Sequence, residues 1–154
     1  MSLEGGIYTI KCKLQDDFVG RHLVEDRSLN PKPVYALVDS TEPPQWLVEK
    51  SEEGYLLCNR GGHATTIESK LFAVLGQDEA LEKWAIEAQP HQGDNLYTIK
   101  KTDDSAGWIQ TTEVGTEPDS FVINVGPLTV RESLPVQYLP SSLFEFVPVI
   151  DIEQ

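Results

Sequence analysis

Three short sequence elements recur along the chain, and this repetition limits its possible folds more than any other feature. The first element begins with tyrosine and occupies residues 8–11, 55–57 and 97–100. The second begins with tryptophan or phenylalanine and occupies residues 46–49, 84–87 and 144–147. The third is apolar and occupies residues 33–37, 70–74 and 135–139. Because such self-similarity marks one supersecondary unit used several times, we predict three copies of the same unit.

Short β-type runs cover the chain, and clusters of Gly, Pro, Asn and Asp separate them as turns. The runs are residues 8–12, 22–26, 34–38, 45–50, 55–59, 64–69, 71–76, 83–88, 97–101, 107–112, 121–126, 128–132, 136–139 and 144–149. Each copy contains a tyrosine strand, a variable strand, an apolar strand and a tryptophan or phenylalanine strand, which gives twelve strands in total. This all-β pattern predicts a β-trefoil, a six-stranded barrel capped by three hairpins, formed by residues 1–154 as one domain.

Alternate residues of these strands should point to one face and fill a shared core. We expect the aromatic residues to pack there, although Trp108 lies outside the repeated positions and is the freest of the three tryptophans. Residues 77–89 also have high helix propensity. The repeat assigns Trp84 onward to a strand and leaves room for one helical turn over residues 78–82.

The composition is that of a globular chain, with 154 residues of which 40% are hydrophobic. A net charge of −13 repels phosphate backbones, so we expect no nucleic-acid partner. No apolar run approaches a membrane span, and the opening MSLEGGIYTIK lacks the pattern of a secretion signal. We therefore expect a cytoplasmic monomer without membrane association. Cys12 and Cys58 are too few for a disulfide framework, and we expect buried free thiols, with a single bridge as the alternative.

The sequence contains no motif that indicates catalysis. His22, His63 and His91 are not spaced like zinc ligands, and there is no nucleophile elbow or phosphate-binding glycine loop. Gly5-Gly6 and Gly61-Gly62 fit turns that need positive φ. We therefore predict no enzyme activity, no metal site and no cofactor, and we expect loops on a rigid scaffold to carry the function.

Residues 24–33, VEDRSLNPKP, are the candidate binding loop. Asn30 and Lys32 each precede a proline, which pushes them toward extended geometry, and the prolines fix their own φ. Asp26 can accept hydrogen bonds from nearby N–H groups and brace the turn. A trypsin-like protease takes such a stiff, extended segment with an outward arginine as substrate, because an acid in its S1 pocket binds the guanidinium. Taken alone, an arginine such as Arg27 is far more often an ordinary surface residue in a turn.

The Gly-x-Tyr-Thr-Ile opening, the acidic strand-and-loop chain and the trefoil repeats resemble the mushroom β-trefoil protease inhibitors, above all the serine protease inhibitors called mycospins. In such inhibitors the loop between the second and third strands carries the residue that enters S1. The resemblance therefore implies a reactive loop at residues 26–32, with Arg27 in the S1 pocket of a trypsin-like protease and Ser28 after the scissile bond. The other protease contacts that it implies are Glu25, Asp26, Leu29 and Asn30.

Other assignments stay open. Arg60, in a glycine-rich loop that we expect to be floppier, is the second candidate for a trypsin-directed arginine. The related mushroom inhibitors of cysteine proteases use a glycine pair in the first strand connection and an asparagine after the fifth strand. Here residues 13–21 contain only the single Gly20, whereas Asn59 lies near the asparagine position. A carbohydrate-binding trefoil lectin would carry repeated Gln-x-Trp motifs, and this chain has only Gln45-Trp46 without a spacer.

Overall fold

Six strands close into a barrel in the computed structural model, which describes residues 3–23, 25–40, 42–75 and 81–149. The barrel strands are β1 (Gly6–Cys12), β4 (Trp46–Ser51), β5 (Gly54–Asn59), β8 (Trp84–Ala88), β9 (Leu96–Lys101) and β14 (Phe144–Pro148). Antiparallel pairing runs from β1 through β4, β5, β8, β9 and β14 and returns to β1. Because each of these strands has a neighbour on both sides, the barrel leaves no open edge.

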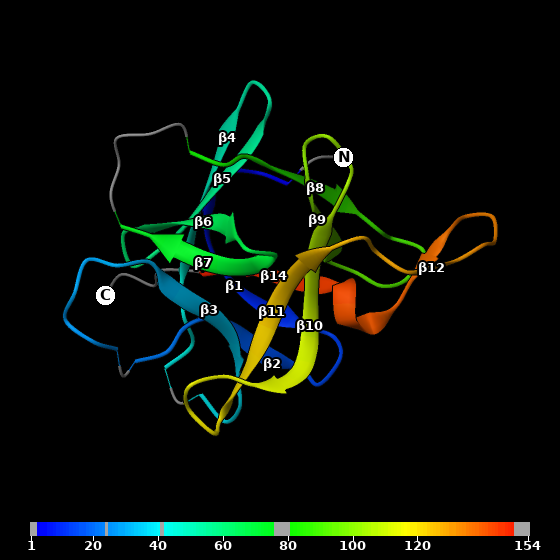
Figure 1. Cartoon of the computed structure of the whole chain (residues 1–154). Helices are drawn as coiled ribbons and strands as arrows, with labels where there is room; N and C mark the ends of the chain where they lie inside the picture. The colour runs from blue at the N-terminus through cyan, green and yellow to red at the C-terminus, as the bar shows by residue number, and fades with distance from the viewer. Residues whose placement is uncertain (1–2, 24, 41, 76–80, 150–154) are drawn as a thin grey trace, which may run out of the picture.

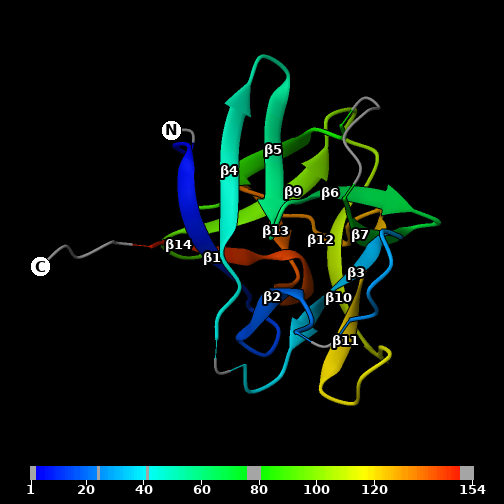
Figure 2. The ribbon, with the colours of Figure 1, turned by 90° about the vertical axis from the view of Figure 1, so that its left-hand side faces the viewer.

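Three hairpins cover one end of the barrel. They are β2 (Asp17–Arg21) with β3 (Lys32–Leu37), β6 (Gly62–Ile67) with β7 (Lys70–Val74), and β10 (Gly107–Val114) with β11 (Ser120–Gly126). Their second strands β3, β7 and β11 pair with one another around the centre of Figure 1. In Figure 2 the barrel strands β1, β4 and β14 lie to the left of the hairpin strands β3, β7 and β11. The predicted twelve-stranded β-trefoil is therefore confirmed.

Aromatic side chains from the three repeats meet in the core. Trp46, Trp84 and Phe144 begin the equivalent strands β4, β8 and β14, and all three are fully buried. Trp108 packs against each of them, with ring centroids 5.6 to 5.8 Å apart. The expectation that Trp108 is the freest tryptophan is wrong, because β10 turns this side chain into the centre of the core.

Two predicted strands are wrongly placed. The described residues of 22–26 form no strand, because the partner of β3 is the preceding segment Asp17–Arg21. Residues 135–139 are not the third copy of the apolar element, since β11 occupies that position in the third hairpin. Instead, Gln137–Tyr138 form β13, which pairs with β12 (Val130–Arg131) in a small sheet of its own.

The segment with high helix propensity follows the repeat where the structure describes it. β8 begins at Trp84, as the repetition predicts. Residues 81–83 have no regular structure, and the rest of the predicted helical turn, residues 78–80, lies outside the described residues. A short 3₁₀ helix over Pro140–Ser142 leads into β14.

Candidate functional site

The predicted reactive loop, residues 26–32, lies in the connection between β2 and β3, residues 22–31, and ends at the first residue of β3. Val24, in the candidate segment 24–33, lies outside the described residues. The two strands pair in four consecutive positions, and Lys32, the first residue of β3, is also in register with Ala73 of β7. In Figure 1 the loop lies at the left of the view, outside the central ring of hairpins. Both ends of the loop are therefore fixed in a hydrogen-bonded sheet.

Arg21 braces the beginning of this loop. Its buried guanidinium donates two hydrogen bonds to the Glu25 carboxylate, at 2.7 and 3.0 Å. It also donates to the backbone carbonyls of Asn59 and Arg60, at 3.2 and 2.8 Å. Bidentate, charge-assisted pairs of this kind are strong and fix geometry. Glu25 thus points inward and ties the loop to the turn between β5 and β6.

Lys32 braces the other side of the loop. Its side chain is only 4% exposed. Its ammonium donates to the Asp26 carboxylate, to the Asp26 carbonyl at 3.1 Å and to the Ser28 hydroxyl at 3.4 Å. Asp26 Oδ1 also accepts the Ser28 N–H at 2.9 Å and the Ser28 Oγ–H at 2.6 Å. Because the loop supplies an acceptor for each of the three ammonium donors, it offsets the cost of burying the lysine.

These hydrogen bonds keep Asp26 ionised. Donation from Lys32, followed by donation from the Ser28 hydroxyl and the Ser28 N–H, holds the pKa of Asp26 well below its usual range. The carboxylate accepts the bonds that the sequence predicted for it, although its side chain is 71% exposed. Both acids that precede Arg27 are therefore engaged within the loop, by Arg21 on one side and by Lys32 on the other.

Arg27 differs from nearly every other basic residue because no partner for its charge is found in the described ranges. Ten of the twelve basic residues contact a carboxylate, a carbonyl oxygen or an aromatic ring. In the described part of the chain, Arg27 and Arg131 make no such contact, and both are exposed. Arg131 lies in β12, in register with Gln137. Arg27 is therefore the unpaired guanidinium whose backbone lies outside any strand.

The second candidate arginine lies in a tight turn. Arg60 and Gly61 join β5 to β6 with φ values of 52° and 84°, as a two-residue hairpin turn of this kind requires. An extended substrate needs negative φ, so this backbone does not fit a protease cleft. Arg60 also donates to the His22 carbonyl at 3.1 Å. Asn59 is fully buried with both ends of its amide hydrogen-bonded, so it cannot meet a protease directly.

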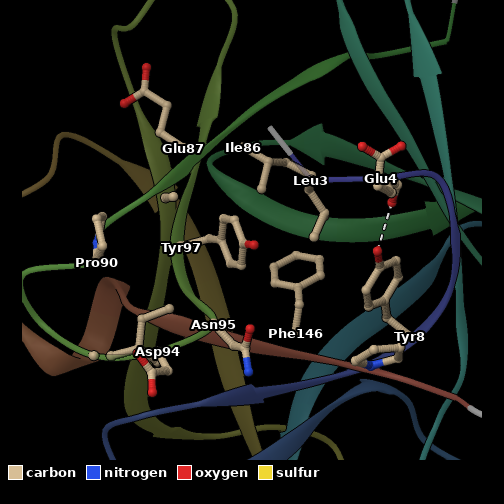
Figure 3. Close-up of a pocket in the computed structure, with 14 residues that line it drawn as sticks. Leu3, Glu4, Tyr8, Ile86, Glu87, Pro90, Asp94, Asn95, Tyr97 and Phe146 are labelled. Carbon is tan, nitrogen blue, oxygen red and sulfur yellow. Dashed lines mark hydrogen bonds between the residues drawn. The ribbon is translucent and has the colours of Figure 1, made fainter. Parts of the chain in front are cut away.

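A depression of about 1410 Å³ opens elsewhere, between the ends of β8 and β14 and the beginnings of β1 and β9. Figure 3 shows Phe146 between Tyr97 and Tyr8, whose hydroxyl donates to the Glu4 carbonyl at 2.7 Å. The ring centroids of Phe146 lie 5.2 Å from Tyr97 and 5.8 Å from Tyr8, both edge to face. Since Phe146 and Tyr8 are buried in this packing, they do not offer a sugar an open ring face. Trp46 of the Gln45-Trp46 pair is fully buried as well.

Both cysteines are free thiols, with Cys12 buried and Cys58 half-buried. Burial raises the pKa of Cys12 to about 12, which keeps its thiol protonated and unreactive at neutral pH. Over the described ranges, no three His, Cys, Asp or Glu side chains gather where they could hold a metal ion. The described segments also contain no helix of the length and apolarity that crossing a bilayer requires.

The fold and the loop define a class of protein. It is a β-trefoil that exposes an arginine, Arg27, on a loop held by ion pairs at both ends. Residues 1–148 match the model of the peptidase inhibitor I66 family. A curated "Serine protease inhibitor" from Lentinula edodes is 41% identical over 128 residues, which cover 82% of this chain and 87% of that protein. The chain belongs to the peptidase inhibitor I66 family, and it is an inhibitor rather than an enzyme.

Solved structures agree with this assignment. A proteinase inhibitor from Coprinopsis cinerea has a TM-score of 0.87 and 32% identity, covering 96% of this chain and 100% of that chain. The designed threefold-symmetric protein ThreeFoil has a TM-score of 0.67 and 13% identity, covering 94% of this chain and 99% of that one. The Rhizoctonia solani agglutinin has a TM-score of 0.61 and 14% identity, covering 97% and 99%. The last two share the fold alone, whereas the predicted resemblance to mushroom serine protease inhibitors is confirmed.

The sequence interpretation missed the two cations that hold the loop, Arg21 and Lys32. Lys32 was available from strand alternation, because it shares one face of β3 with the buried Val34 and Ala36. A charge on such a face indicates a buried ion pair. Arg21 had no comparable signal, since the preceding strand was placed at residues 22–26 instead of Asp17–Arg21.

Proposed function

We propose that this inhibitor acts on trypsin-like serine proteases and that Arg27 is the side chain that enters their S1 pocket. The observation that carries the proposal is the unpaired, exposed guanidinium of Arg27 on a loop braced from both sides. Among the residues that the structure describes, its positive charge has no partner, so binding to an acidic pocket breaks no ion pair seen there. Ser28 follows as the residue after the scissile bond.

A braced loop lowers the entropic cost of binding. Fixing a flexible side chain or loop at an interface costs about 0.5–1.5 kcal/mol for each mobile side chain. Here Glu25 and Asp26 are already held by Arg21 and Lys32 before any protease arrives. Both carboxylates are paired with cations, Glu25 with Arg21 and Asp26 with Lys32. They therefore repel the acid of the S1 pocket less than unpaired carboxylates would.

The residues after Arg27 supply the rest of the proposed contact surface. Leu29 is 83% exposed, and Ser28 and Asn30 are also exposed. A lone exposed leucine is common on protein surfaces. Two positions after the proposed S1 residue, however, it can cover an apolar subsite of the protease. We expect a monomeric inhibitor that binds one protease molecule through this loop.

Replacing Arg27 tests this proposal, with Arg60 as the matched control. We expect Arg27→Asn to weaken trypsin inhibition by about 100-fold or more, because loss of a buried charged contact at a hot spot costs roughly 3 kcal/mol or more. Arg60→Asn should change the inhibition constant by less than about threefold. Thermal unfolding of both variants checks that the fold is intact. Unchanged inhibition by a folded Arg27→Asn variant would show that another residue enters S1.

A further inference from the structure

Four hydrogen bonds connect the two sides of the Arg27–Ser28 peptide bond. Two run from the Lys32 ammonium to the carbonyl and carboxylate of Asp26. The other two run from the N–H and the hydroxyl of Ser28 to the same carboxylate. If this peptide bond is cut, Asp26 stays with the acyl fragment, while Ser28 and Lys32 stay with the amine fragment. All four hydrogen bonds then bridge the break.

We propose that Lys32 is a positioning residue that keeps the cut ends of the loop together, so that resealing of the peptide bond outruns hydrolysis. The inference rests on the proposed function, since it requires a protease that attacks after Arg27. Resealing is what makes the loop an inhibitor instead of a substrate, and the buried lysine would favour it.

The chemistry defines what the lysine must hold. The protease serine hydroxyl attacks the Arg27 carbonyl carbon, the C–N bond to Ser28 breaks, and the Ser28 nitrogen leaves as an amine that takes up one proton. The product is an ester between the Arg27 carbonyl and the protease serine. If the Ser28 amine stays in place, it attacks this ester, re-forms the peptide bond and returns the proton to the serine oxygen. If the amine moves away, water attacks and releases nicked protein.

The geometry favours the first outcome. Asp26 Oδ1 already accepts the Ser28 N–H at 2.9 Å, so the same carboxylate can hold the amine after cleavage. Lys32 also binds that carboxylate, and its side chain is buried, with 4% exposed. The lysine is itself anchored, because its backbone is in register with Ala73 in the ring of hairpins. An amine that is held next to the ester reacts with an effective concentration far above that of a free reactant.

The test measures the ratio of nicked to intact inhibitor at equilibrium with a trace of trypsin. For each protein, one reaction starts from intact and a second from nicked inhibitor. Mass spectrometry follows both until they reach the same ratio of nicked to intact protein. Lys32→Met keeps an apolar stem of similar length, and Asp26→Asn keeps the shape of an exposed side chain. Lys100→Met is the matched control, because Lys100 is 12% exposed and pairs with Glu87 and Asp104 outside the loop.

We expect the ratio of nicked to intact protein to rise at least tenfold in Lys32→Met and in Asp26→Asn, and inhibition by both to fade with time. The wild type and Lys100→Met should agree within twofold. If Lys32→Met does not fold, Asp26→Asn decides the matter, since its side chain is exposed. If the folded variants give a ratio within twofold of wild type and are still cut after Arg27, the role of Lys32 is overturned but the proposed function is not. A wild type that trypsin neither binds nor cuts after Arg27 would overturn the proposed function as well.

Discussion

The loops at residues 26–28 and 103–105 contain the same Asp-x-Ser turn with the same internal hydrogen bonds. In each, the aspartate Oδ1 accepts the serine N–H at 2.9 Å and the serine Oγ–H at 2.6 Å. The turns differ in what surrounds them. The middle residue is the unpaired Arg27 in one loop, whereas in the other it is Asp104, which has a φ of 69° and pairs with Lys100 at 2.8 Å.

The aspartates differ in their further partners. Asp26 also binds the buried ammonium of Lys32, whereas no lysine or arginine bonds the Asp103 carboxylate in the residues that the structure describes. The Asp-x-Ser turn thus depends on hydrogen bonds between neighbouring residues and does not by itself mark a reactive loop. Two residues distinguish the proposed reactive loop from the second turn. Arg27 supplies an exposed guanidinium in the middle of the turn, and Lys32 supplies a buried ammonium that binds Asp26.

Moving the arginine to the second turn gives the largest expected effect. In an Arg27→Asn background, Asp104→Arg creates an Asp-Arg-Ser sequence that lacks the ammonium. We expect this double variant to inhibit trypsin at least about 100-fold more weakly than the wild type, for two reasons. Position 104 has a φ of 69°, whereas an extended substrate needs negative φ, and the turn alone does not preorganise the contact. An inhibition assay checks the potency, and mass spectrometry locates any cut. Recovery of wild-type inhibition would mean that the turn suffices without Lys32.

Removing Arg21 tests the other brace through stability. Arg21 and Glu25 have side chains that are 6% and 11% exposed. Loss of Arg21 removes a donor from two carbonyls and leaves the shielded Glu25 carboxylate with only the longer contact to Arg60, at 3.6 Å. We expect Arg21→Met to lower the free energy of unfolding by about 3 kcal/mol. Lys70→Met is the control, because Lys70 and Glu113 form a pair with side chains 45% and 58% exposed, for which we expect at most about 1 kcal/mol. Urea unfolding compares the two, and equal losses would contradict a special role for the Arg21 brace.

The two aspartates also differ in how they respond to pH. The Ser105 hydroxyl and N–H lower the pKa of Asp103, and the added Lys32 lowers that of Asp26 further. A depressed native pKa means that the bonds to Asp26 contribute stability above the unfolded value of about 3.9 and lose it only as the pH falls through the native pKa. Carboxyl-carbon NMR titration should give Asp26 the lower midpoint.

Lys32→Met should raise the Asp26 midpoint toward that of Asp103 and leave the Asp103 midpoint unchanged. Lys100→Met is again the control, and it should leave Asp26 where it is. If the Asp26 midpoint does not move in Lys32→Met, the ammonium does not set the charge of that carboxylate.

The repetition predicted most of the fold because it depends on long-range symmetry rather than on any one segment. The equivalent positions of Trp46, Trp84 and Phe144 identified the barrel strands correctly. The errors arose where local pattern was used alone. Residues 22–26 have strand-like composition, but the pairing of β2 with β3 uses the preceding residues. The β-type run at 135–139 pairs only with β12, because β11 already occupies the hairpin position.

The proposed site was predictable in part for a similar reason. The prolines and Asp26 are local signals, so the stiffness of the loop and the bracing by Asp26 followed from the sequence. The anchoring of Glu25 did not. Arg21 is only four residues away, but the Arg60 carbonyl that Arg21 also binds reaches the loop only through the fold. The positive φ of Arg60, which argues against its insertion into a protease, is likewise a property of the folded hairpin.

A crystal structure of the chain bound to trypsin tests the role of Arg27 most directly. We predict that the Arg27 guanidinium forms two hydrogen bonds with the acid at the bottom of the S1 pocket, with Ser28 beyond the catalytic serine and Asp26 still bonded to Lys32. A complex in which Arg60, Arg131 or any lysine occupies that pocket would contradict the proposal.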